Sequence, residues 1–332
     1  MWKKSAFIFL GICTGSLFVF FFSRIFQSRT FLTSATNQPI QYTHRIYDPV
    51  SFETLSTTPF YPQPFSELKK LEVTEKYRSS IVSFPTISGN VSAVLYVPQG
   101  KGPFPVIVLL RGYVDKDKYV SGTGTKRAAM YFAEKGYLTI SPDFLGFGLS
   151  DPEPNDTMMA RFEKPRTVLQ LLASLSSIEL ADPKNVGIWA HSNGGQIAIS
   201  VLEISKQAYP TTLWAPVSEA FPQSILQYVD ELDDKGAYLK SELEKFALTY
   251  TYEDFDIGAH LDSIQTNLQV HQGVEDEEVP VNWSDTFVKN MKDRTQKVEY
   301  YTYPRENHNF TRGSVNTLLE RDLIFFERNL RK

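Results

Sequence analysis

A serine, an acidic loop and a histidine stand where covalent catalysis would need them. Ser192 lies in GIWAHSNGG, residues 187–195, between an apolar run and a helical run. A serine hydroxyl attacks a carbonyl when a base removes its proton and an acid orients that base. The acidic loop GVEDEEVP, residues 273–280, and the histidine of RENHNF, His308, each follow a later apolar run. This order predicts acyl transfer to water, a reaction that requires no metal or organic cofactor.

The residues around Ser192 are typical of a nucleophile elbow, a sharp turn between a strand and a helix. Ala190 and Gly194 stand two positions before and after the serine, where small residues avoid clashes. Gly195 allows the following helix to pack closely. The alternative is an ordinary serine that caps a helix after a glycine-rich turn.

The elements that would position these residues alternate along the chain. Apolar runs at 81–84, 91–97, 106–110, 138–141, 186–190, 212–215, 268–272 and 298–303 predict strands. Helical patterns occupy 126–136, 166–176, 196–208 and the segment from 315 onward. Such alternation predicts an α/β fold with a mostly parallel sheet and helices on both faces. Residues 218–263 interrupt it with charged helical segments, and we expect a small helical cap above the carboxyl ends of the strands.

Three motifs together resemble the prolyl oligopeptidase (peptidase family S9) and dienelactone hydrolase group of α/β-hydrolases. HQGVEDEEVP is similar to the group's acid loop, H-G-x-x-D-x-x-V-P, and YPRENHNF is similar to its histidine loop. PDFLGFGLSD, residues 142–151, resembles the loop after the fourth strand. The resemblance covers about residues 80–332. It implies an α/β-hydrolase fold in which Asp276 is the orienting acid and His308 the base. Gln272 is an insertion relative to the pattern.

Of the three catalytic residues, the orienting acid is the one whose identity the sequence determines least. Glu275, Glu277 and Glu278 flank Asp276 in the same loop. The loop could otherwise be a solvated turn. The motif match favours Asp276.

The oxyanion hole of this fold uses two donors aimed at the developing negative charge. Asn193, directly after the nucleophile, would supply one backbone N–H. Tyr113 would supply the second from the loop after the third main strand, and the resemblance also permits its hydroxyl to contribute. That loop reads Arg111-Gly-Tyr where a His-Gly pair is usual, and Arg111 could bind a substrate carboxylate or form a salt bridge. We expect His191 and His271 to be structural.

Composition excludes several other classes of protein. The 332 residues carry a net charge of −4 without a basic stripe, which argues against a nucleic-acid partner. The single cysteine, Cys13, leaves the folded part without a disulfide or a thiolate metal site.

The N-terminal segment predicts attachment to a membrane. Residues 5–22 carry no charge and would span roughly 27 Å as a helix. We expect residues 1–29 to form a single membrane anchor, with a cleaved signal peptide as the alternative and a buried soluble helix as the last one. Residues 30–75, rich in Ser, Thr, Pro and Gln, predict an extended stalk before a catalytic domain at 76–332. We expect that domain to be extracytoplasmic, or secreted if the segment is cleaved.

The resemblance favours a serine peptidase acting on a small peptide. A carboxylesterase acting on a small or medium acyl ester is a close rival, because the sequence has no β-propeller to filter peptides. A non-catalytic binding module on a membrane stalk is the alternative from another class. An enzyme that cleaves carbon–halogen bonds would require Asp at position 192.

Overall fold

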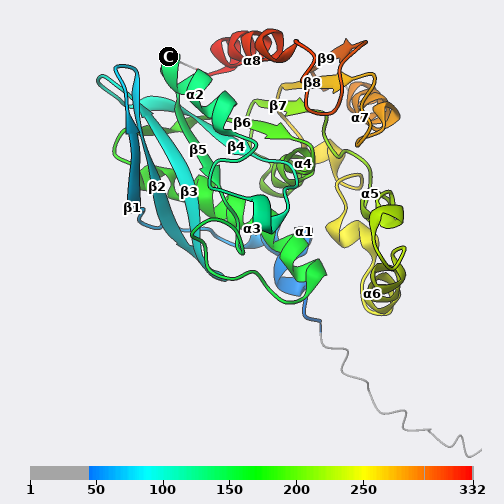
Figure 1. The fold of residues 1–332 in the computed structure, drawn as a ribbon. Coiled ribbons are helices and arrows are strands. Elements are labelled where there is room, and N and C mark those ends of the chain that lie inside the picture. Colours follow the sequence, from blue (N-terminus) through cyan, green and yellow to red (C-terminus); the bar gives the residue numbers. More distant parts are fainter. Residues whose placement is uncertain (1–44, 295, 331–332) are drawn as a thin grey trace, which may run out of the picture. The chain divides into compact units, whose positions relative to one another are not determined.

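The computed structural model describes residues 45–294 and 296–330, and these form one nine-stranded sheet with helices on both faces (Figure 1). The sheet contains β1 Ser66–Val73, β2 Tyr77–Thr86, β3 Gly89–Pro98, β4 Phe104–Leu110, β5 Leu138–Pro142, β6 Ala181–His191, β7 Thr211–Trp214, β8 Leu268–Gly273 and β9 Val298–Tyr303. Their spatial order is β1-β2-β3-β5-β4-β6-β7-β8-β9.

The strands from β5 to β9 in this order run parallel, while β1, β2 and β3 are antiparallel additions at one edge. In the register, Ala190 of β6 lies beside Leu213 of β7, and Gly273 of β8 lies beside Tyr303 of β9. The carboxyl ends of β6, β8 and β9 therefore open at the same edge of the sheet, where the loops that follow them can meet.

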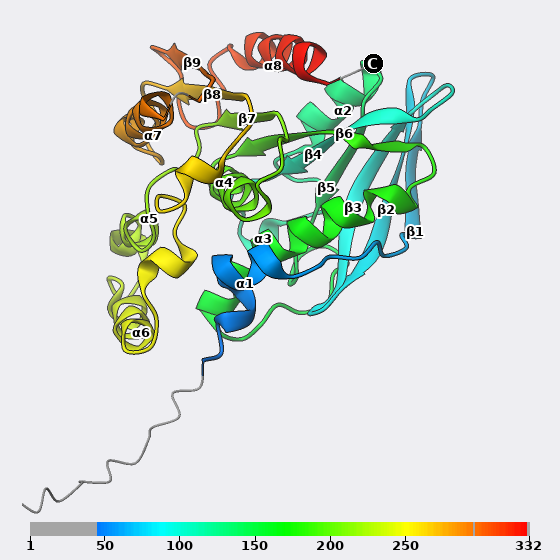
Figure 2. The ribbon, with the colours of Figure 1, turned by 180° about the vertical axis from the view of Figure 1, so that it is seen from behind.

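Helices pack on the two faces because neighbouring residues of each buried strand point in opposite directions. Val106, Val108 and Leu110 of β4 join the core cluster that contains side chains of α1, α3, α4 and α7. Ile107 and Leu109 join the opposite cluster with side chains of α2 and α8. Figure 2 shows the positions of these two helices beside the sheet. The helices are α1 Phe52–Thr57, α2 Lys126–Glu134, α3 Thr157–Ser174, α4 Asn193–Ser205, α5 Gln223–Leu226, α6 Ala237–Ala247, α7 Val281–Asp293 and α8 Val315–Asn329.

The segment between β7 and β8 forms the cap predicted for residues 218–263. It consists of α5, α6 and short 3-10 turns rather than two full helices. Phe221, Phe246 and Phe255 of this segment pack in one cluster with Tyr47 and Phe162 of the main domain. The cap is therefore fixed to α3 and to the start of the described chain by aromatic side chains.

The stalk predicted for residues 30–75 is wrong for the part that the structure describes. The described residues from 45 onward form one compact unit that includes α1 and β1. Phe52 and Leu55 of α1 are buried in the core. All eight residues of β1 are exposed, so this edge strand has a polar sequence without the apolar alternation that predicts strands.

The helix predicted at 166–176 begins nine residues earlier, at Thr157. Asp156 caps it by accepting a hydrogen bond from the backbone N–H of Met159. Pro165 lies inside the helix, although proline at this point usually marks a helix start.

No helix within residues 45–330, as far as they are described, is long and apolar enough to cross a membrane. The predicted anchor at residues 1–29 lies outside the described residues.

Candidate active site

Ser192 occupies a strained turn between β6 and α4. Its backbone has φ 55° and ψ −122°, a conformation that L-residues avoid. A Cβ on Gly194 would lie 2.1 Å from the carbonyl oxygen of Leu110, and one on Gly195 would lie 2.5 Å from Cβ of Pro216. Both positions therefore require glycine. The turn has the geometry of a nucleophile elbow, in which the serine side chain stands at the strand's carboxyl end.

His308 and Asp276 form a buried hydrogen-bonded pair beside this turn. Nδ1 of His308 lies 3.0 and 2.9 Å from the two carboxylate oxygens of Asp276. The two side chains are 2% and 0% exposed, so bulk water does not compete for this contact. Asp276 follows β8 and His308 follows β9, as the sequence predicted.

Asp276 is held in place by donors other than the histidine. The backbone N–H groups of Glu278 and Val279 donate to its Oδ1 at 2.9 and 2.8 Å. Gln272 donates from Nε2 to Oδ2 at 2.8 Å, and its own Oε1 accepts from Ser284. Burial raises the pKa of Asp276, but the hydrogen bonds to its charged form outweigh burial and leave that pKa below its ordinary value.

The three flanking glutamates have different partners. Glu275 pairs with Arg312 at the surface. Glu277 accepts a long hydrogen bond, 3.4 Å, from the backbone N–H of His308. Glu278 places Oε2 3.5 Å from Nε2 of His308, on the side of the ring away from Asp276. Of the four acids in the loop, Asp276 alone contacts Nδ1.

The ring of His308 packs against the ring of His191, the residue before Ser192. The ring centroids are 4.8 Å apart, and Nε2 of His191 lies 3.2 Å from the backbone carbonyl oxygen of His308. Burial, followed by the neighbouring His308, lowers the pKa of His191 to about 4. His191 is therefore neutral at pH 7 and donates from Nε2–H to that carbonyl, which fixes the His308 loop beside the Ser192 turn.

Ser192 Oγ and His308 Nε2 share no hydrogen bond among the interactions of the described residues. In free enzymes such contacts are often longer than in the complex with substrate. Ser192 is 8% exposed and faces the same cavity as Glu278.

The two predicted oxyanion donors, Asn193 and Tyr113, both line this cavity. The Tyr113 hydroxyl donates to Asp115 at 3.1 Å, and the side chain is exposed. Its hydroxyl is therefore already hydrogen-bonded to Asp115, which leaves the backbone N–H of Tyr113 as the group that could donate to an oxyanion. Gly112 keeps the loop close to the serine, because a Cβ there would lie 3.0 Å from Cβ of Ser192.

Arg111 is a support of the oxyanion loop and not a salt-bridge partner in the described structure. Its guanidinium donates to the backbone carbonyls of Gly112 and Asp143, at 2.9 and 3.1 Å. It also lies over the rings of Tyr119 and Phe147, 4.4 and 4.2 Å from their centroids. These contacts hold residues 111–113 against the loop that follows β5.

His271 is structural, as predicted. It is fully buried in β8, with Nδ1 2.7 Å from the hydroxyl of Tyr303 and Nε2 3.0 Å from Oδ1 of Asp322.

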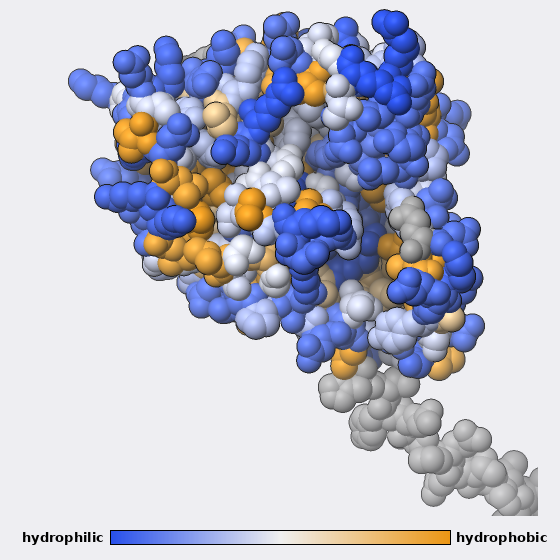
Figure 3. All heavy atoms as spheres, viewed as in Figure 1, coloured by the Kyte–Doolittle hydropathy of each residue, from blue (hydrophilic) through white to orange (hydrophobic). Residues whose placement is uncertain are grey.

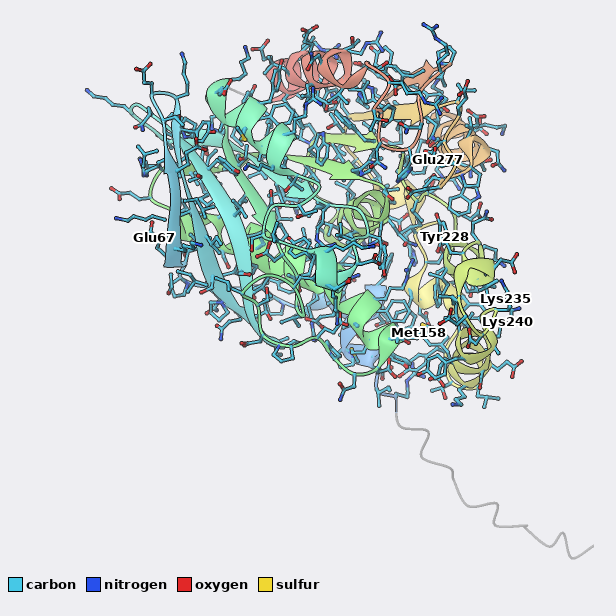
Figure 4. The ribbon with its side chains drawn as sticks, in the orientation of Figure 1. Glu67, Met158, Tyr228, Lys235, Lys240 and Glu277 are labelled. Carbon is cyan, nitrogen blue, oxygen red and sulfur yellow. The ribbon has the colours of Figure 1, made fainter. Side chains whose placement is uncertain are left out.

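The cavity above Ser192 has a volume of about 1670 Å³ and lies between the main domain and the cap. The space-filling view shows the surface hollowed there, with hydrophilic residues inside (Figure 3). Met158 lines it from α3 and Tyr228 from the cap (Figure 4). Arg161 and Lys164, two further residues of its wall, were not anticipated from the sequence. Among the described residues no group of three His, Cys, Asp or Glu side chains is arranged to hold a metal ion.

Comparison with known proteins gives a family match over most of the domain. The family model described as the prolyl oligopeptidase family matches residues 126–332. An uncharacterized 31.7 kDa protein in the traX-finO intergenic region of Escherichia coli is 27% identical over 109 residues. That match covers 33% of this chain and only 36% of the relative's length.

Solved structures with this fold include both esterases and peptidases. Acetyl xylan esterase 1 from Thermoanaerobacterium superposes with a TM-score of 0.59 and 14% identity, over 85% of this chain and 94% of that one. The Pyrococcus furiosus esterase Pf2001 superposes with a TM-score of 0.55 and 18% identity, over 83% of this chain and 100% of that one. Pyrococcus horikoshii acylaminoacyl peptidase superposes with a TM-score of 0.58 and 20% identity, over 77% of this chain but only 42% of that one. These likenesses confirm the predicted α/β-hydrolase fold.

Proposed function

The chain belongs to the prolyl oligopeptidase family and is a serine hydrolase, and we propose that Ser192, His308 and Asp276 are its nucleophile, base and orienting acid. The observation that carries this proposal is the buried Asp276–His308 pair beside the strained Ser192 turn. Asn193 and Tyr113 would supply the oxyanion donors from their backbone N–H groups.

The reaction follows from these positions. Oγ of Ser192 bonds to the substrate carbonyl carbon while its proton passes to Nε2 of His308. Asp276 accepts from Nδ1–H and so holds the ring in the tautomer whose Nε2 is free. The leaving group departs with the proton from Nε2. Water then attacks the acyl-enzyme while Nε2 of His308 takes a proton from it, and that proton passes to Oγ of Ser192 as the ester bond to the serine breaks and the acid is released.

Peptide cleavage is the first candidate for the acyl bond. An amine leaving group must be protonated as the C–N bond breaks, more so than an alcohol or phenol. The Glu278 carboxylate, 3.5 Å from Nε2, attracts the positive charge that the ring carries at that step. This arrangement supports an enzyme that protonates an amine.

Ester hydrolysis is the second candidate, and the extent of the structural matches favours it. The chain aligns with 94% and 100% of two esterase chains but with 42% of the acylaminoacyl peptidase chain. The surface is hollowed at the cavity (Figure 3), so a small or medium ester could enter directly.

A matched pair of substrates tests the choice. N-acetyl-alanine 4-nitroanilide and the corresponding 4-nitrophenyl ester share one acyl group, and hydrolysis of each is measured in wild type and in Ser192→Ala. Ser192-dependent release of nitroaniline supports the peptidase, whereas Ser192-dependent cleavage of the ester alone assigns an esterase.

We further propose that residues 5–22 anchor the full chain in a membrane with the hydrolase domain outside the cytoplasm. The support is their uncharged apolar sequence after Lys3 and Lys4. The full chain should sediment with membranes, resist extraction at alkaline pH and retain its N-terminal residues. A soluble product shortened at its N-terminus would instead establish a cleaved signal peptide.

A further inference from the structure

Two cationic side chains of α3 line the cavity that contains Ser192. Arg161 and Lys164 are three residues apart on this helix, so they project from the same side of it. Both belong to the second and third turns of α3, beyond the capping contacts of Asp156.

Neither cation forms an ion pair with a carboxylate among the described residues. The charge of Glu153 acts on Lys164, but the Glu153 carboxylate itself pairs with Lys116. Arg161 donates to Oε1 of Gln196 and to Oγ of Ser224, 3.4 Å away, and both of these partners are neutral. Lys164 makes no hydrogen bond or ion pair with a described residue. By contrast, Lys116 on the same cavity pairs with Glu153.

Of the acidic side chains that line the cavity, Glu153 is near enough to act on Lys164, and the other three have different surroundings. Asp115 pairs with Lys118, and Asp117 is exposed in the 113–117 loop. Glu278 lies beside His308. The α3 wall therefore carries two positive charges without an ion pair, and a partly buried charge of this kind is costly unless a counter-ion occupies the site.

Both Arg161 and Lys164 carry a positive charge at neutral pH. Burial, followed by repulsion from Arg161 and Arg111, lowers the pKa of Lys164 to about 8. Burial lowers the pKa of Arg161 to about 10. At pH 7 both side chains are therefore mainly protonated.

The position of Arg161 determines how far a bound anion would lie from the substrate carbonyl that Ser192 attacks. Its partner Gln196 comes four residues after Ser192, which is about 6 Å along the axis of α4. An anion held by Arg161 would therefore lie several bonds away from the carbon that Ser192 attacks.

The charge of Glu278 decides which part of the substrate carries the anion. The leaving group must face Nε2 of His308 to receive its proton, and the Glu278 carboxylate is 3.5 Å from that atom. A negative leaving group would be repelled there, so the anion belongs to the acyl portion.

We propose that Arg161 and Lys164 form a carboxylate-binding subsite for the acyl part of the substrate, such as a dicarboxylic monoester or a peptide with an acidic residue before the scissile bond. The planar guanidinium can bind both carboxylate oxygens, and the ammonium adds a second charge. This inference rests on the proposed function, because it assumes that Ser192 accepts the acyl group.

The test compares two isosteric acyl groups in the full chain. The 4-nitrophenyl monoester of adipic acid ends in a carboxylate, and the matching ester of adipamic acid ends in a neutral amide. The ratio of their kcat/KM values is measured in wild type, Lys164→Gln and Arg161→Gln. Lys240→Gln, exposed on the α6 cap, is the control (Figure 4). A neutral fluorophosphonate labels Ser192 independently in each variant.

Wild type should prefer the carboxylate ester by roughly tenfold or more, as one charge-assisted contact provides. Lys164→Gln should lose most of this preference while Ser192 is still labelled, and Lys240→Gln should keep the preference. Lys164→Glu should favour the 6-aminohexanoyl ester instead, which keeps the test valid if Arg161→Gln fails to fold.

Two negative results are distinguishable. A ratio near unity in wild type that labels normally, or an unchanged ratio in Lys164→Gln and Lys164→Glu, would overturn the subsite alone. Absence of labelling in folded wild type would overturn the proposed function and the subsite with it.

Discussion

Glu278 lies against Nε2 of His308, while Asp276 holds Nδ1 of the same ring. The first contact is 3.5 Å and involves a half-exposed carboxylate, and the second is 2.9 Å and fully buried. One imidazole thus has a buried acid on one side and a solvent-facing acid on the other. The two carboxylates should have different effects on catalysis when each is neutralised.

Glu278→Gln should slow cleavage of the nitroanilide more than cleavage of the matching nitrophenyl ester. The nitroanilide needs the proton from His308 more, and a partly exposed ion pair contributes up to about 1 kcal/mol, or about fivefold. Steady-state kcat/KM for both substrates measures the difference. An equal loss with both substrates would contradict the proposed role of Glu278 on the leaving-group side.

Asp276→Asn should reduce kcat by on the order of 10³- to 10⁴-fold, because the amide cannot orient and stabilise the protonated ring as a carboxylate does. Glu275→Gln, which removes only the surface pair with Arg312, is the matched control and should stay near wild type. Hydrolysis of one nitrophenyl ester suffices for the comparison. A larger loss in Glu275→Gln than in Asp276→Asn would show that the acid is misassigned.

Tyr113→Phe should change kcat by less than about threefold on any substrate, since the hydroxyl bonds to Asp115 and the backbone N–H remains. Loss of a true oxyanion donor costs about 10²-fold or more. A loss of that size in Tyr113→Phe would assign the role to the hydroxyl instead of the backbone.

Glu203→Met should stabilise the domain at pH 7. Both carboxylate oxygens of Glu203 are buried without a hydrogen bond in the described structure. Burial, followed by repulsion from Asp256, holds the pKa of Glu203 well above its ordinary value of 4.5. Replacing the group by an apolar side chain should raise the free energy of unfolding by about 1–3 kcal/mol.

The pH dependence of Glu203 has a defined sign. Because the folded state binds the proton more tightly, its stabilising contribution is complete below pH 4.5 and is lost as pH rises through the folded pKa. The gain in melting temperature in Glu203→Met should therefore grow from pH 4.5 towards neutral pH. A gain that is constant or decreases with pH would contradict the assignment.

Much of the fold could be predicted because its central strands are apolar and its turns contain glycine. All eight predicted strands are present, with boundaries that differ by no more than a few residues. The strand β1 could not be predicted, because its side chains face solvent and its order comes from pairing with β2. The start of α3 was obscured by Pro165.

The site was predictable to the extent that each residue follows its own strand in a short motif. Ser192, Asp276 and His308 lie where those motifs place them, and Asn193 and Tyr113 line the same cavity. Glu278, Arg161 and Lys164 could not be assigned from the sequence. Their importance depends on which side chains face them across the cavity, and on the fact that Arg161 and Lys164 form no ion pair with the described residues.

The central claim is that His308 and Asp276 activate Ser192. The most direct measurement is the rate of covalent labelling by a neutral fluorophosphonate, with the modified residue located by peptide mass analysis. Wild type is compared with Ser192→Ala and His308→Ala, and the folded state of each is checked by its thermal transition. Labelling confined to Ser192 and lost in both variants is the predicted result. A folded wild-type protein that is not labelled, or that is labelled at another serine, would contradict the claim.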